Sequence, residues 1–168
     1  MSLTHLDASG RAEMVDVGAK PETARRAVAE GRVIMSAEAF EQVQSATVAK
    51  GDVITVAELA GVMGAKRTSD LIPLCHPVPL SHLTVAVELE ASWPGVRVVA
   101  SATATARTGV EMEALVAVSV ACLTVYDMVK AVDKGMRIDR IRLLEKSGGR
   151  RGTWLATDEQ HQHATEAE

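Results

Sequence analysis

The longest periodic stretch of the chain runs from Gly109 to Lys134. Its apolar side chains recur at spacings of three and four residues: Leu115, Val118, Cys122, Val125, Val129 and Val132. This spacing puts them on one face of a helix of roughly six or more turns. Gly109 and Gly135 flank the stretch where helix stop signals are expected. The pattern therefore predicts a long helix whose apolar stripe lies in the core.

Alternating apolar and polar positions predict four strands elsewhere in the chain. These strands cover Ala24–Met35, Leu83–Glu90, Val96–Ala106 and Ile138–Lys146. The turn residues Trp93-Pro94-Gly95 join the second and third strands into a hairpin. A shorter piece, Glu13–Val17, is predicted to form a minor strand or an arm.

Two further helices are predicted between the first two strands. Ser36 can cap a helix over Ala37–Ala46, and Asp52 can cap one over Val53–Ser69. The stretch Leu71–Leu80 contains three prolines, which forbid a helix and predict an extended loop.

The resulting order is strand, helix pair, strand, strand, helix, strand. That order predicts an α+β, ferredoxin-like fold, with helices packed on one face of an antiparallel sheet. Small residues on both faces of the Val96–Ala106 strand suggest that the other face of the sheet is covered, for example by another subunit. We expect one domain over residues 1–152, with a mobile tail over residues 153–168.

Composition narrows the functional classes. Charged residues are 24% and apolar residues 47% of the 168, as in an ordinary globular protein, and aromatics are only 2%. Val and Ala must therefore fill the core, and a base-stacking platform for nucleic acid is disfavoured. The net charge of -4 gives no overall attraction to nucleic acid or to an anionic membrane. Two cysteines, no signal-peptide pattern and no run near 18 apolar residues lead us to expect a cytoplasmic protein.

Lys66 and Arg67, near the end of the second predicted helix, have two equally weighted interpretations. They are either a solvated helix terminus or a phosphate clamp leading into the next loop. Cys75-His76 lies in that proline-rich loop, which can pre-position the imidazole. A metal site there remains an alternative, although zinc needs three or four ligands.

Asp127 and Lys130 lie three residues apart on the long helix and can touch. Most such pairs are surface ion pairs, whereas a partly buried pair would be a tuned acid and base. Lys50 and Lys146 lie near glycines, which indicates exposed loops. The segment Lys146–Arg151 (KSGGRR) suits phosphates without being specific for them. From these residues alone, the sequence predicts an α+β domain with an anionic-ligand site.

Six separated segments carry a family resemblance. They are MVDV (14–17), KGDV (50–53), AKRTSDLIPLCHP (65–77), TGVEMEAL (108–115), YDMVKA (126–131) and LLEKSGG (143–149). Together they resemble the MoaC-type cyclic pyranopterin monophosphate synthases of molybdenum cofactor biosynthesis, over roughly residues 3–152.

The resemblance implies a reaction and an assembly. The family converts 3′,8-cyclo-7,8-dihydroguanosine 5′-triphosphate into cyclic pyranopterin monophosphate and releases pyrophosphate. It implies a homohexamer, built as a trimer of dimers with sites between subunits. We expect no cofactor and no protein-held metal, and the sequence leaves open whether Mg²⁺ accompanies the triphosphate.

The resemblance also assigns roles to residues. Asp127, Lys130 and Lys50 match catalytic positions, with Lys130 and Asp127 as the main acid–base couple. The matching substrate-binding positions are Leu74, Cys75, His76, Glu111, Met112, Glu113 and Lys146. We expect His76 and Lys146, with Lys66 or Arg67, to neutralise phosphates, and Glu113 to bind the guanine-derived N–H edge.

Helix geometry adds an independent expectation. Asp127 follows Glu113 by 14 residues, which is roughly 21 Å along a helix. If both residues touch one substrate, they come from different subunits. The alternative function is a non-catalytic nucleotide-binding oligomer, which would bind the same ligand without turnover.

Overall fold

Five strands and four helices make up residues 9–157, the part of the chain that this computed structural model describes. The strands are β1 (Thr23–Ile34), β2 (His82–Glu90), β3 (Gly95–Ala106), β4 (Arg137–Ser147) and β5 (Trp154–Leu155). The helices are α1 (Ala37–Gln44), α2 (Val53–Ala65), α3 (Thr68–Leu71) and α4 (Glu111–Val129). All the strands pair antiparallel in the order β2-β3-β1-β4-β5.

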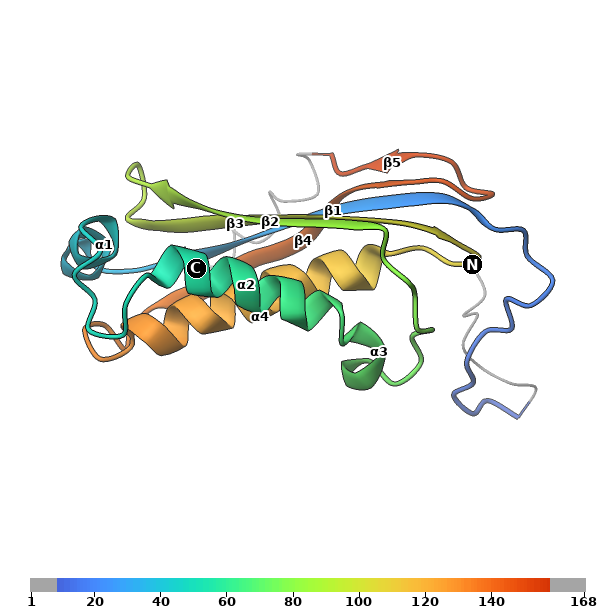
Figure 1. Ribbon diagram of the computed structural model, residues 1–168, viewed down its shortest axis with the longest axis horizontal. Coiled ribbons are helices and arrows are strands. Elements are labelled where there is room, and N and C mark those ends of the chain that lie inside the picture. The colour runs from blue at the N-terminus through green and yellow to red at the C-terminus, as the bar shows by residue number, and fades with distance from the viewer. Residues whose placement is uncertain (1–8, 158–168) are drawn as a thin grey trace.

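This arrangement confirms the predicted α+β, ferredoxin-like fold. Figure 1 shows α2 and α4 lying side by side along one face of the sheet, and both helices contact it. The predicted hairpin is present, with Glu90 of β2 opposite Gly95 of β3. The central strand β1 pairs with β3 on one side and with β4 on the other.

The core between the sheet and α4 is built from Val and Ala, as the composition predicts. Alternate residues of β3 face the helices and are buried: Val96, Val98, Ala100, Ala102, Ala104 and Ala106. The helical stripe is buried at Val118, Cys122, Val125 and Val129. By length and apolar composition α4 could cross a membrane, but it is mostly buried against the sheet and α2.

Glycine allows α2 to approach α4 closely. A Cβ atom on Gly61 would lie 2.9 Å from the backbone oxygen of Ala117 and 2.9 Å from a methyl group of Val85. A Cβ atom on Gly64 would crowd Val120. Any larger residue at these positions would push the two helices apart, so the spacing of the helical layer depends on them.

Several element boundaries differ from the predicted ones. The helix α4 has 19 residues, about five turns, and ends before Val132. The predicted helix over Val53–Ser69 is divided into α2 and α3, because the Thr68 hydroxyl donates to the Ala65 carbonyl and the chain turns there. Residues 13–17 form an arm and no strand.

The C-terminal segment also differs. The two residues of β5 lie in the segment predicted to be a mobile tail, yet they pair with Glu145 and Lys146 of β4. The rest of the predicted tail, from residue 158, lies outside the described residues.

The sheet face opposite the helices has a buried ionic cluster at its centre. Glu30 of β1 is 3% exposed. Its carboxylate accepts hydrogen bonds of 2.9 and 2.8 Å from Arg97 Nε and Nη2, and one of 2.7 Å from Arg142 Nε. In Figure 1 no helix covers this face within the described residues. Its burial by another subunit remains a prediction.

Candidate functional site

Three charged side chains meet at the C-terminal end of α4. Lys130 Nζ lies 2.6 Å from Asp127 Oδ1, and Lys50 Nζ lies 2.7 Å from Asp127 Oδ2. Lys50 also donates to the backbone carbonyl of Asp127, at 2.7 Å. One carboxylate therefore holds two ammonium groups, one from its own helix and one from 77 residues earlier in the chain.

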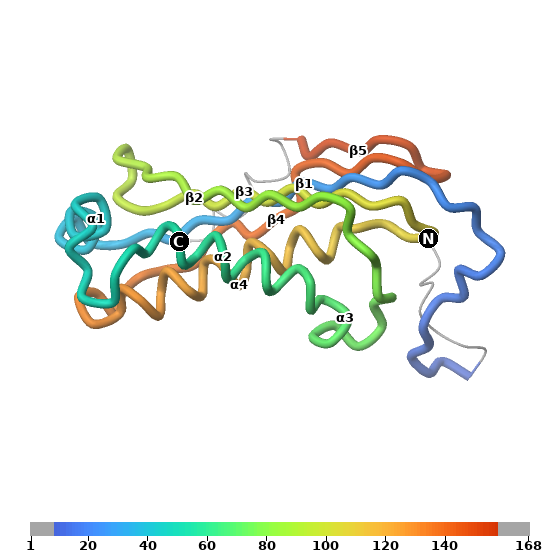
Figure 2. The backbone as a smooth tube through the Cα atoms, viewed as in Figure 1, coloured from blue at the N-terminus to red at the C-terminus, as the bar shows by residue number. Residues whose placement is uncertain are grey.

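Local structure explains how Lys50 reaches the helix. It precedes Gly51, whose φ of +96° allows a tight turn closed by a 2.9 Å bond from its N–H to the Val48 carbonyl. Asp52 then caps α2 by accepting a 3.0 Å bond from Thr55 N–H. The turn is thus fixed between α1 and α2, beside the end of α4 (Figure 2).

The cluster is a solvent-facing ion triad in the single chain. The side chains of Lys50, Asp127 and Lys130 are 46%, 57% and 50% exposed. The partial burial that would make Asp127 and Lys130 a tuned pair is absent from one chain alone. An isolated exposed pair is a weak stabilising contact, so this triad contributes little to folding.

Mutual attraction shifts the pKa values of both Asp127 and Lys130. Hydrogen bonds from Lys130 and then Lys50 lower the pKa of Asp127 to about 2. The same hydrogen bond and charge raise the pKa of Lys130 above its ordinary value. At neutral pH Asp127 is therefore a carboxylate and Lys130 an ammonium group. In this state Lys130 can donate a proton or neutralise an anion, and it must lose that proton before it can act as a base.

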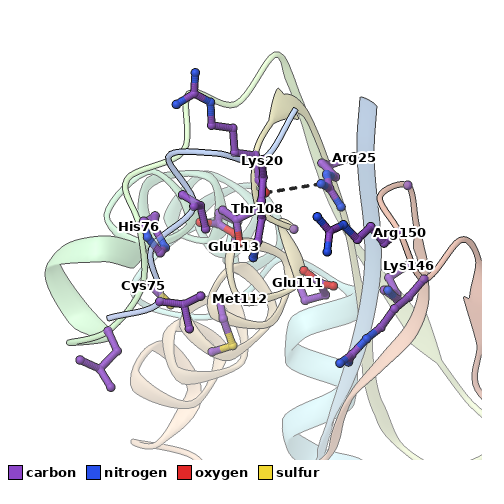
Figure 3. A pocket seen from close by; sticks show the side chains of 17 residues that line it. Lys20, Arg25, Cys75, His76, Thr108, Glu111, Met112, Glu113, Lys146 and Arg150 are labelled. Atoms are coloured by element: carbon purple, nitrogen blue, oxygen red, sulfur yellow. Dashed lines mark hydrogen bonds between the residues drawn. The ribbon is translucent and has the colours of Figure 1, made fainter. Parts of the chain in front are cut away.

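A cavity of about 650 Å³ lies at the other end of α4. All seven substrate-binding residues expected besides Lys66 and Arg67 line it: Leu74, Cys75, His76, Glu111, Met112, Glu113 and Lys146. Figure 3 labels all of these residues except Leu74, and they come from three parts of the chain: the loop before β2, the first turn of α4 and the end of β4. The structure thus gathers these predicted positions around one space.

The cavity is strongly cationic. Besides Lys146, five basic residues line it: Lys20, Arg25, Arg107, Arg150 and Arg151. Arg150 and Arg151 belong to the basic segment noted in the sequence. The other three were missed, because they are scattered through the chain and only folding brings them together. Such a cluster matches a ligand that carries several negative charges.

Arg25 and Arg107 connect the walls of the cavity. Arg25 Nε donates to the Ala106 carbonyl at 3.3 Å, and its Nη2 donates to the Arg107 carbonyl at 3.5 Å. Arg107 in turn donates to the Gly18 carbonyl at 3.1 Å and lies 3.8 Å from Glu22. These contacts attach the arm before β1, which carries Lys20, to the end of β3.

Two acidic residues, Glu111 and Glu113, also line the cavity. Glu113 is buried, and this burial, assisted by the charge of Glu111, raises its pKa, although its own backbone N–H opposes the shift. Burial, with the charge of Glu113, also raises the pKa of the Cys75 thiol. Cys75 is therefore a poor nucleophile, and the carboxylate is placed to receive N–H donors.

Lys66 and Arg67 stand apart from this cavity. Lys66 lines a smaller space of about 320 Å³ that borders Glu113, and Arg67 lines neither space. Their phosphate-binding role stays a prediction. Within residues 9–157 no group of three or more His, Cys, Asp or Glu side chains could hold a metal ion. The Cys75-His76 pair has no third ligand in that part of the chain, which is one fewer than the smallest zinc site needs.

The two clusters lie at opposite ends of one helix. The lysine–aspartate triad is beside the α1–α2 turn, and the cavity is beside α3 and the arm (Figure 1). Fourteen residues separate Glu113 from Asp127, which corresponds to roughly 21 Å along the helix. One small ligand cannot contact both clusters of a single chain.

Comparison with known proteins identifies close relatives. A family model described as "MoaC family" matches residues 14–149. A protein of Methylobacterium sp. (strain 4-46) is 60% identical over 155 residues, covering 92% of this chain and 97% of the relative. A relative from Thermomicrobium roseum is 56% identical, covering 96% of this chain and 98% of the relative. One from Brucella ovis is 58% identical, covering 93% of this chain and 94% of the relative. All three are named cyclic pyranopterin monophosphate synthase.

Proposed function

The chain belongs to the MoaC family, and from this membership and the geometry of the two clusters we propose the reaction that it catalyses. It is an enzyme of molybdenum cofactor biosynthesis, a cyclic pyranopterin monophosphate synthase. Its substrate is 3′,8-cyclo-7,8-dihydroguanosine 5′-triphosphate, and its products are cyclic pyranopterin monophosphate and pyrophosphate.

The observation that carries the proposal is the meeting of Lys50, Asp127 and Lys130. Lys50 is 77 residues from Asp127 in sequence, so the tertiary fold has to bring its turn to the end of α4. The contact adds little to stability, since all three side chains are exposed. An ion cluster that stabilises little, and in which the pKa values of Asp127 and Lys130 are shifted, is a candidate site for chemistry.

The cationic cavity supports the choice of substrate. A triphosphate brings several negative charges, which Lys146, Arg25 and His76 can neutralise. The same cations stabilise the charge that develops on the leaving pyrophosphate. Glu113, at the buried side of the cavity, accepts the N–H edge of the guanine-derived ring.

The triad of Lys50, Asp127 and Lys130 carries out the proton transfers. Opening the guanine ring by hydrolysis and rebuilding it as a pyrazine requires several protons to move. Lys130 begins as an ammonium group and donates first, and Asp127 orients it and holds Lys50 beside it. Lys50 serves as the second proton carrier. No thiol, redox group or metal ligand of this chain is needed in these steps.

The site is shared between chains. Because the cavity and the triad are roughly 21 Å apart along α4, a substrate in the cavity of one subunit meets the triad of another. We accordingly propose a homohexamer, a trimer of dimers, with its active sites at subunit interfaces. Any Mg²⁺ enters with the triphosphate. The free thiols of Cys75 and Cys122 support a reducing, cytoplasmic location.

Turnover tests the reaction. The cyclic dihydro-GTP intermediate is supplied to the wild type, Asp127→Ala and Lys130→Ala, and pyrophosphate and pterin product are followed. We expect turnover in the wild type and a loss of about 10²–10⁴-fold in the variants. Lys134→Ala is the matched control, since Lys134 is an exposed lysine four residues beyond Lys130. Binding without pyrophosphate release by the wild type would refute the synthase and favour a nucleotide-binding protein.

Subunit mixing tests the shared site. His76→Ala removes a cavity residue and Lys130→Ala removes a triad residue, so each variant alone should be inactive. In mixed oligomers about a quarter of the sites combine one intact cavity with one intact triad, and activity should return to that level. If mixtures remain inactive although the subunits are shown to exchange, the interface proposal fails while the reaction can still stand.

A further inference from the structure

Two glycines follow β4 at the edge of the cavity, and both have left-handed backbone conformations. Gly148 has φ of +96° and Gly149 has φ of +72°. Gly148 lines the cavity together with the adjoining basic residues Lys146, Arg150 and Arg151. The pair turns the chain at the side of the space where Lys146 and Arg150 lie (Figure 3).

A side chain would meet a different obstacle at each glycine. A Cβ atom on Gly148 would overlap the backbone carbonyl oxygen of Ala24, which belongs to β1 and cannot move aside. A Cβ atom on Gly149 would overlap Nη1 of Arg25 and lie 2.7 Å from its Cζ. The obstacle at Gly149 is thus the end of one flexible side chain.

The Arg25 guanidinium is held in a defined place. It lies over the Gly149 backbone and donates to the carbonyls of Ala106 and Arg107 at the end of β3. From there it lines the cavity beside Lys146. Its position therefore depends on two features: the carbonyl pair on one side and the missing side chain of Gly149 on the other.

We propose that Gly149 is a positioning residue for phosphate binding, because the absence of a side chain there lets the Arg25 guanidinium occupy the polyphosphate wall of the cavity. This inference rests on the proposed function for the identity of the phosphate ligand. A methyl group at position 149 moves the guanidinium and leaves the sheet intact, since only a flexible side-chain end has to give way.

The chain offers a matched control. Gly152 has φ of +60°, also left-handed, and nothing lies within 4 Å of the position of its Cβ. Alanine therefore strains the backbone at both positions, but it displaces Arg25 only at position 149. The comparison of Gly149→Ala with Gly152→Ala separates the displacement from the strain.

The first readout is binding of inorganic pyrophosphate and of tripolyphosphate by calorimetry. We expect Gly149→Ala to weaken the Kd about tenfold, as expected for a lost charge-assisted contact, and Gly152→Ala to leave it near the wild-type value. In an Arg25→Ala background, Gly149→Ala should have no further effect. Equal losses in the two glycine variants, or a full additional loss without Arg25, would overturn the inference.

The second readout is turnover. Gly149→Ala should raise KM for the triphosphate substrate about tenfold with a smaller effect on kcat, because the triad is untouched. A wild type that binds pyrophosphate without turnover would overturn the proposed function, and the binding comparison would still decide the role of Gly149. A wild type that turns over, with unaltered KM and Kd in Gly149→Ala, would overturn the role of Gly149 alone.

Discussion

Replacing Glu30 with glutamine should destabilise the fold far more than its position on an uncovered sheet face implies. The carboxylate is 3% exposed and accepts charge-assisted hydrogen bonds from Arg97 and Arg142. Glutamine keeps the shape but turns an N–H group toward donors, and it leaves Arg142 without this carboxylate and Arg97 with only the more distant Glu88. Removing one member of a buried ionic group costs about 3–5 kcal/mol. Arg97 and Arg142 are 36% and 22% exposed, so water partly solvates them and we expect the lower end, about 3 kcal/mol.

Glu88, which also lies near Arg97, provides an internal control. Glu88 lies 3.9 Å from Arg97 but is 64% exposed. A surface contact of this kind is worth under about 1 kcal/mol, so Glu88→Gln should be nearly silent. Both variants remove a carboxylate beside the Arg97 guanidinium, but Glu30 is buried and also binds Arg142, whereas Glu88 is exposed and lies 3.9 Å from Arg97.

The Glu30 contribution should also depend on pH. Burial by itself raises the pKa of Glu30, but the hydrogen bonds and charges of Arg97 and Arg142 outweigh it, and the net pKa is below the ordinary 4.5. A carboxyl with a lowered folded-state pKa stabilises the fold above its unfolded-state pKa. That contribution is lost as pH falls through the folded-state value. The difference between wild type and Glu30→Gln should therefore be full at pH 7 and shrink below about pH 4.5.

Urea unfolding measures these differences. It should be followed at one fixed protein concentration, since any oligomer makes the apparent free energy of unfolding depend on concentration. The reasoning is refuted if Glu30→Gln costs no more than Glu88→Gln at pH 7. It is also refuted if the Glu30→Gln difference persists unchanged down to pH 3.

Three further predictions concern the helices and the thiols. Asp127→Asn removes the carboxylate that raises the pKa of Lys130, so the alkaline limb of the pH–rate profile should move to lower pH; an unmoved limb would exclude Lys130 as its source. Gly61→Ala should cost about 1–3 kcal/mol in urea unfolding, because its Cβ would lie 2.9 Å from a backbone oxygen of α4; a neutral change would show that the helices can separate freely. Burial raises the pKa of Cys122 to about 12 and also raises that of Cys75. Iodoacetamide at pH 8 should therefore leave Cys122 unmodified in the native protein and label Cys75 slowly, which mass spectrometry of digests can measure. Rapid labelling of Cys122 would contradict its burial.

Strong periodicity made the framework predictable. The alternation in β3 and the stripe of α4 each reflect one buried face, and burial decides where such segments lie. The boundaries were less predictable, because they depend on single hydrogen bonds. The Thr68 hydroxyl bonded to the Ala65 carbonyl ends a helix that the apolar pattern alone would continue.

The candidate site divides in the same way. The pair Asp127 and Lys130 is visible in sequence because a helix puts residues three apart on one face. The contact of Lys50 with that pair comes from tertiary structure, and no local pattern carries it. Arg25 is the clearest case, since its place depends on the carbonyls at the end of β3 and on a glycine after β4. The family resemblance identified Lys50 as a site residue, whereas no sequence pattern identified Arg25.

The exposure of Lys50, Asp127 and Lys130 to water determines whether the Asp127–Lys130 ion pair can act as an acid–base couple. In a single chain, the Lys130 side chain is 50% exposed and Asp127 raises its pKa, so Lys130 keeps its proton and cannot serve as a base near neutral pH. In the proposed assembly, the cavity wall of another subunit would cover the end of α4 and remove water from it. Desolvation disfavours the charged form of a lysine and lowers its pKa. A shared site would therefore tune Lys130 as well as bring it to the substrate, and the separation of the two clusters along α4 makes both effects depend on assembly.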